Sequence, residues 1–186
     1  APDQHTRTHP DPRITANELA RYMVSSDTGR IGIIRRAHES KTPQRIRYKD
    51  VRAVLRRALP DAANERKIIA DAKTMFDQRA KDASLNEFAR DDAAKSLDVL
   101  TAFSDVRNKL AGFDYTPAPR HQPALDLAGV DVSVAVDLLI HRDITGKPAE
   151  IGAVLFRLTQ SDEETENAAS KRREMGLYAA TLVRMH

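Results

Sequence analysis

Arginine side chains crowd into one stretch of this chain, residues 30–57, and their chemistry is that of phosphate binding. The stretch holds ten basic residues and two acidic ones, a surplus of eight positive charges in a chain whose total is +3. Eight of the ten are arginines, whose planar guanidinium pairs with two phosphate oxygens at once. The sequence therefore predicts a polyanion-binding surface, and its candidate contacts are Arg35, Arg36, Arg45, Arg47, Arg52 and Arg56.

The composition of this stretch limits what it recognises. Tyr48 is the one aromatic residue within it, so a platform on which bases stack is not supported. Residues 18–38 faintly resemble a helix-turn-helix, but the break at 25–29 is longer than that motif allows. We therefore expect contacts with the phosphates of DNA or RNA, made by a non-catalytic accessory protein. The alternative is that the arginines face an acidic protein partner, a second copy, or acidic helices of the same chain.

A second candidate chemistry comes from two carboxylates in a hairpin pattern. Apolar residues alternate over 130–140, a turn-like segment follows at 143–148, and a second apolar run covers 151–158. Asp137 lies on the first run and Glu150 precedes the second. Residues 130–158 resemble the core hairpin of the PD-(D/E)XK nuclease superfamily, where an Asp on one strand and a Glu-x-Lys on the next hold magnesium. The resemblance implies metal-assisted hydrolysis.

The spacing of this hairpin argues against an active metal site. When the turn is placed midway between the two runs, Asp137 faces Val154. Gly152 and Val154 then stand where the family has its Glu and Lys, and neither side chain binds a metal ion. Glu150 lies opposite His141, about 13 Å along the strand from Asp137. We expect a degenerate, non-cleaving relative with Asp137 as a hydrogen-bonded acid, and we keep a metal-dependent nuclease as the last alternative.

Other site chemistries are excluded by residue types. The chain contains no cysteine, so it forms no disulfide, thiolate zinc site or iron–sulfur cluster. Its six histidines form no pair at metal-ligand spacing on one helix face, and no nucleophile elbow, Walker loop or dinucleotide fingerprint is present. No window of the sequence is long and apolar enough to span a membrane, and we expect no signal peptide in its first residues. We expect no cofactor, no metal, no membrane contact and a cytoplasmic protein.

The elements that position these residues are mostly helices. A capping box of Thr15 and Glu18 predicts the start of a first helix, and a second begins near residue 31 after a break at 26–29. A third helix covers 48–59, where Pro60 ends it. The remaining helix starts are predicted at Asp61, at a capping box of Ser84 and Glu87, and at Ser161 or Asp162.

Composition also divides the chain along its length. Residues 1–13 contain three prolines and are expected to be a disordered lead-in. A helical region covers 14–112, a Pro-rich connector 113–123, and a strand-hairpin-helix unit 124–186, beginning with a short strand at 124–127. Because a sheet of so few strands needs a covering partner, we expect the two parts to share one core. The predicted fold class is α+β: a helical N-terminal two-thirds and a small antiparallel sheet with a long C-terminal helix packed on it.

Overall fold

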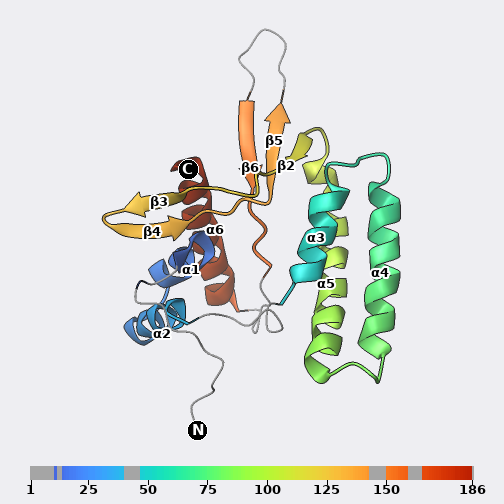
Figure 1. Ribbon diagram of the computed structural model, residues 1–186, viewed down its shortest axis with the longest axis horizontal. Coiled ribbons are helices and arrows are strands. Elements are labelled where there is room, and N and C mark those ends of the chain that lie inside the picture. The colour runs from blue at the N-terminus through green and yellow to red at the C-terminus, as the bar shows by residue number, and fades with distance from the viewer. Residues whose placement is uncertain (1–10, 12–13, 40–46, 143–149, 159–164, 186) are drawn as a thin grey trace. The chain divides into compact units, whose positions relative to one another are not determined.

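The computed structural model describes residues 11, 14–39, 47–142, 150–158 and 165–185, and within them it confirms the α+β fold class (Figure 1). The expected lead-in, apart from residue 11, the expected turn at 143–148 and Arg45 lie outside these residues. In chain order the elements are β1 (Ile14–Thr15), α1 (Ala16–Met23), α2 (Asp27–Ala37), α3 (Lys49–Ala58), α4 (Glu65–Lys81), α5 (Glu87–Leu110), β2 (Asp114–Pro117), β3 (Ala124–Leu127), β4 (Val130–Ser133), β5 (Leu138–Arg142), β6 (Glu150–Val154) and α6 (Glu166–Met185).

The elements form two compact units, each assembled from segments that are separate in the sequence. Unit 1 contains β1, α1, α2, β3, β4 and α6, and unit 2 contains α3, α4, α5, β2, β5 and β6. Among the described residues, each unit has one three-stranded sheet, in the order β1-β4-β3 or β2-β5-β6. The chain passes from unit 2 to unit 1 between Ala118 and Pro119, within the expected connector at 113–123. Each unit also contains segments from both sides of this connector, because β2 pairs with β5 and β1 pairs with β4.

In unit 1, α1 is the central helix. It begins with the expected capping box: the Thr15 hydroxyl accepts from the Glu18 amide at 3.2 Å, and the Glu18 carboxylate accepts from the Thr15 amide at 3.0 Å. The helix contacts β1, β4, α2 and α6. Ala16 and Ala20 of α1 and Ala179 of α6 are all buried, and such small side chains let two helices approach closely.

In unit 2, three helices and a sheet share one hydrophobic core. The helices α4 and α5 lie side by side, and α3 contacts both of them (Figure 1). Leu55 of α3, Phe76 of α4, Leu100 of α5 and Leu138 of β5 are each at most 2% exposed and belong to one cluster. The third helix therefore forms as predicted because its apolar residues recur at helical spacing and face this core.

Two helices begin at residues other than those expected. The Asn86 side chain caps α5, accepting from the Ala89 amide at 2.8 Å, and Ser84 instead donates its hydroxyl to Asp82 at 2.7 Å. The expected start of α4 at Asp61 is also wrong. The Asp61 carboxylate accepts a hydrogen bond from the backbone amide of Asn64, the residue before α4, at 3.2 Å. Polar residues near a helix start compete for the same free amides, so sequence alone misplaces these two caps.

The second helix begins earlier than the sequence predicts. Residues 26–29, expected to break the chain, instead contain the start of α2 at Asp27. The caps expected for the last helix, Ser161 and Asp162, lie outside the described residues, and the structure describes that helix from Glu166 onward. Its main contact in unit 1 is with α1. None of the helices described here is long and apolar enough to cross a membrane.

The single strand expected over 130–140 is wrong. The strand β4 ends at Ser133, β5 begins at Leu138, and the two belong to different sheets. Between them the Val136 amide donates to the Gln122 side-chain oxygen at 2.9 Å, and the Gln122 amide donates back to the Val136 carbonyl at 3.0 Å. One side-chain amide thus takes the place of a partner strand. Val134 is still buried, so the alternation reports burial and not strand pairing.

The register of the hairpin differs from the expected one by one residue. Leu138, and not Asp137, is the partner of Val154, and Arg142 is the partner of Glu150. The other edge of β5 is paired with β2, which occupies the first part of the expected connector. A shift of one residue exchanges the two faces of a strand, so the positions compared with the nuclease motif change as well.

Candidate anion-binding pocket

The third helix has one apolar face and one basic face. Val51 and Leu55 are buried in the core of unit 2. On the other face, Lys49 and Arg56 are exposed and Arg52 is half-buried. Spacings of three and four residues place these three side chains along one side of the helix. Burial of the apolar face therefore presents the basic residues as a row.

This basic face forms part of a pocket of about 440 Å³, here called the α3 pocket. Its lining residues are Arg47, Tyr48, Lys49, Arg52, Ala53, Arg56 and Leu158. Of the six arginines expected from the sequence, Arg47, Arg52 and Arg56 thus meet at one site. The structure adds Lys49, which belongs to the same helical row.

Arg47 is held in the pocket wall by an acidic and an aromatic partner. Its guanidinium forms an ion pair with Asp91 of α5 and lies 4.9 Å from the centre of the Phe88 ring. Asp91 also accepts from Lys95 at 3.0 Å. The hydrogen bond from Arg47, followed by that from Lys95, lowers the pKa of the Asp91 carboxyl. The guanidinium is therefore fixed in place, and its charge is matched.

Arg52 is held by Asp137, the acid singled out in the sequence. The Arg52 Nε lies 3.7 Å from Asp137 Oδ1, and Arg52 Nη2 donates to the Phe156 carbonyl. Asp137 is 2% exposed, and its Oδ2 accepts from the Phe156 amide at 2.8 Å. The carboxylate, directly before β5, thus joins α3 to the segment after β6, as a hydrogen-bonded structural acid would.

The contact between Arg52 and Asp137 places a positive charge where the metal-site alternative needs a metal ion. A guanidinium beside Asp137 supplies the positive charge that a metal ion would supply. Within the described residues no group of three histidine, aspartate or glutamate side chains is arranged to hold a metal ion. The Glu150 side chain lies outside that description.

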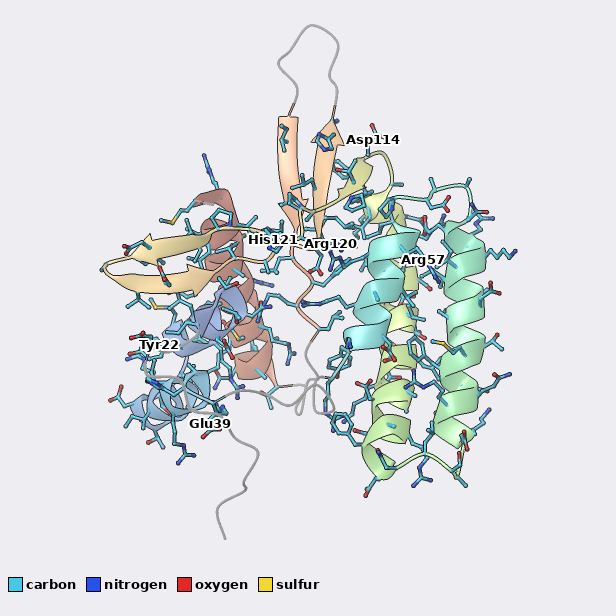
Figure 2. All side chains as sticks on the ribbon, in the orientation of Figure 1. Tyr22, Glu39, Arg57, Asp114, Arg120 and His121 are labelled. Atoms are coloured by element: carbon cyan, nitrogen blue, oxygen red, sulfur yellow. The ribbon has the colours of Figure 1, made fainter. Side chains whose placement is uncertain are left out.

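Lys49 and Arg56 differ from the two arginines that carboxylates hold. Both are exposed, and neither side chain forms a hydrogen bond or ion pair in the part of the chain that the structure describes. The next residue, Arg57, is also exposed and lies on α3 (Figure 2), but it does not line the pocket. The pocket therefore contains two cationic side chains that are available to a ligand.

Arg35 and Arg36 occur elsewhere, in the last turn of α2 in unit 1, and both are exposed. Cations at this end of a helix interact favourably with its dipole, so these two arginines have a local structural explanation. Arg45 lies outside the described residues. The sequence thus indicated three residues of the α3 pocket among its six candidates.

Two features of the site were missed by sequence reasoning. Lys49 belongs to the basic stretch but is not among the six expected contacts, although its spacing from Arg52 and Arg56 follows the helical repeat. Tyr48 has a left-handed backbone with φ of 61°, and its amide donates to the Asp92 carboxylate at 2.8 Å. Non-glycine residues rarely adopt this conformation, and no local sequence signal announces it. Burial raises the pKa of the Tyr48 hydroxyl.

The arrangement is suited to holding an anion. Four cationic side chains line the pocket beside an apolar part formed by Tyr48 and Leu158. Guanidinium and ammonium groups donate hydrogen bonds and accept none, so they favour phosphate or carboxylate oxygens. No protein-family model, curated protein or solved structure matches this chain. The residues of the pocket are therefore the basis for a functional proposal.

Proposed function

We propose that this protein binds nucleic acid without cleaving it, through contacts between the α3 pocket and phosphate groups. The observation that carries the proposal is the convergence of Arg47, Lys49, Arg52 and Arg56 in one pocket. Phosphate contacts supply most of the affinity of proteins that bind nucleic acid without reading its sequence. DNA or RNA is the partner, and the cytoplasm is the compartment expected from the sequence.

Two of these four cations are held by carboxylates, which supports the proposal. Asp91 and Asp137 hold Arg47 and Arg52 in fixed positions, so a ligand binds without the cost of ordering those long side chains. Lys49, with no partner among the described residues, supplies charge that the protein does not neutralise. A site with both properties is prepared for an anion.

The experiment is a titration of fluorescently labelled DNA and RNA, single- and double-stranded, followed by anisotropy at several salt concentrations. Binding is expected to weaken steeply with salt, because each neutralised phosphate releases counterions. The test variant is Lys49→Ala/Arg56→Ala, which removes two cations without an acidic partner in the described part of the chain and leaves both carboxylate pairs intact. On duplex DNA it should lower the magnitude of the logarithmic salt slope by about 2.

The matched control is Arg66→Ala/Lys67→Ala. It removes the same charge from two exposed residues at the start of α4 that do not line the pocket. The control should keep the affinity and the salt slope of the unmodified protein. If both variants weaken binding equally, the effect is one of net charge, and the pocket is not the binding site.

The outcome also separates this proposal from its main alternative. If no nucleic acid binds even at low salt, the basic row faces an acidic protein or a second copy of the chain. Sedimentation of the same samples then measures whether the protein forms oligomers. Within unit 2, Arg79 of α4 already forms an ion pair with Asp50 of α3 at 2.6 Å. A protein partner or a second copy would contact the basic row through ion pairs of the same kind.

A further inference from the structure

The charge balance within the α3 pocket is uneven. Asp91 and Asp137 each neutralise one arginine of the lining. Lys49 and Arg56 have no acidic partner among the residues that the structure describes. Asp92, which accepts from the Tyr48 amide, and Lys95, which donates to Asp91, cancel each other. The lining residues and their bonded partners therefore carry two positive charges in excess.

The shape of the pocket limits the ligand that enters it. Its volume is about 440 Å³, within the range of small-molecule sites, which hold molecules of nucleotide size. A DNA duplex is wider than its own major groove, which is about 12 Å across. A duplex is therefore too wide to enter a pocket of this volume and contacts it only from outside. Tyr48, Ala53 and Leu158 add an apolar part to the lining, against which the sugar or base of one nucleotide packs.

These observations distinguish the two kinds of phosphate in a nucleic acid. An internal phosphodiester carries one negative charge, whereas a phosphate monoester carries about −1.5 to −2 near neutral pH. Two excess positive charges match the second kind. We propose, on the basis of the function proposed above, that the α3 pocket binds the terminal phosphate monoester of a nucleic-acid strand. Lys49 and Arg56 distinguish it from an internal phosphate.

The experiment compares one short single-stranded oligonucleotide in three forms: with a 5′-phosphate, with a 3′-phosphate, and with hydroxyls at both ends. Affinities are measured by anisotropy, with the dye at the unmodified end or on an internal base. At least one phosphorylated form is expected to bind about tenfold more tightly than the hydroxyl form, the effect of one or two additional charge-assisted hydrogen bonds.

Two variants test whether this preference belongs to the pocket. Lys49→Ala/Arg56→Ala should bind all three forms with nearly equal affinity. Arg66→Ala/Lys67→Ala should keep the preference. The changed side chains are exposed, and melting curves of both variants should match that of the unmodified protein. A preference that survives in Lys49→Ala/Arg56→Ala overturns the assignment to this pocket.

The remaining outcomes separate the two proposals from each other. If all three oligonucleotides bind equally well to the unmodified protein, the inference about strand ends is wrong and backbone binding stands. If none binds, the proposed function itself fails. Competition by AMP, with adenosine as its control, distinguishes a strand end from a free nucleotide. Binding of AMP as tight as that of the phosphorylated strand overturns the assignment to nucleic acid.

Discussion

The side chains of Arg52 and Asp137 meet although they are far apart in the sequence. Arg52 Nε of α3 lies 3.7 Å from Asp137 Oδ1, and the Arg52 side chain is 37% exposed whereas that of Asp137 is 3% exposed. One end of this ion pair is thus in the core of unit 2, and the other lines the α3 pocket. The pair connects the stability of the unit with the geometry of its candidate site.

Removing the Asp137 carboxylate is expected to destabilise unit 2. Asp137→Ala leaves the Phe156 amide and the Arg52 guanidinium without this acceptor, at a cost of about 2–3 kcal/mol in the free energy of unfolding. Asp137→Asn keeps an oxygen that accepts from Phe156 and should cost about 1 kcal/mol. Urea denaturation measures both values. The control is Asp105→Ala at an exposed position of α5, and equal losses for all three variants would contradict this account.

Two leucines on the longest helices should differ in their importance for stability. Leu100 of α5 is 0% exposed, whereas Leu177 of α6 is 64% exposed. Leu100→Ala opens a cavity in the core and should cost about 3–4 kcal/mol. Leu177→Ala removes an exposed side chain and should change the free energy of unfolding by less than about 0.5 kcal/mol. Chemical denaturation of the two variants tests the burial of both positions, and similar losses would refute it.

The Arg47–Asp91 pair predicts a local pH dependence. Hydrogen bonds from Arg47 and Lys95 lower the pKa of Asp91 in the folded protein. The stabilising contribution of this acid is therefore complete above the ordinary carboxyl pKa and is lost as the pH falls through the lowered value. In Arg47→Gln the pKa of Asp91 should rise toward its ordinary value. NMR titration of the side-chain carboxyl carbon measures this change, and an unchanged Asp91 pKa would show that the pair does not form.

A single substitution in the connection between β3 and β4 should stabilise the protein. Ala128 and Gly129 both have positive φ, 55° and 81°, and the Gly129 amide donates to the Asp126 side chain at 2.7 Å. Asparagine tolerates this backbone better than alanine does, and Asn-Gly is preferred in two-residue hairpins. Ala128→Asn should therefore stabilise the protein by about 0.5–1 kcal/mol.

Thermal denaturation measures the effect of Ala128→Asn on stability. A substitution that should have the opposite effect, Gly129→Ala, serves as the control. Gly129→Ala forces a Cβ into a left-handed position and should cost about 1 kcal/mol. If Ala128→Asn destabilises the protein as much as Gly129→Ala does, the backbone of this connection differs from the one described.

Local signals in the sequence were sufficient for several elements and for part of the site. The capping box of Thr15 and Glu18 predicted the start of α1 because its hydrogen bonds join residues within one turn. The row that contains Arg52 and Arg56 follows from the repeat of α3 alone. The register of β5 could not be obtained in this way, because β2 pairs with its other edge and no local pattern encodes that partner.

The amino-acid sequence by itself determined the α+β class, the apolar and basic faces of α3, and the alternating burial of Val134 and Val136. These properties depend on neighbours within a few residues, where helical and extended periodicities act. Only the tertiary structure decided that Gln122, and not a strand, satisfies the backbone of Val136. It also decided that Asp137 holds Arg52, whereas Arg56 has no acidic partner among the described residues. Such pairings form between distant segments when the core packs, and the energies that select them are those of burial and of hydrogen bonds that only the folded chain brings together.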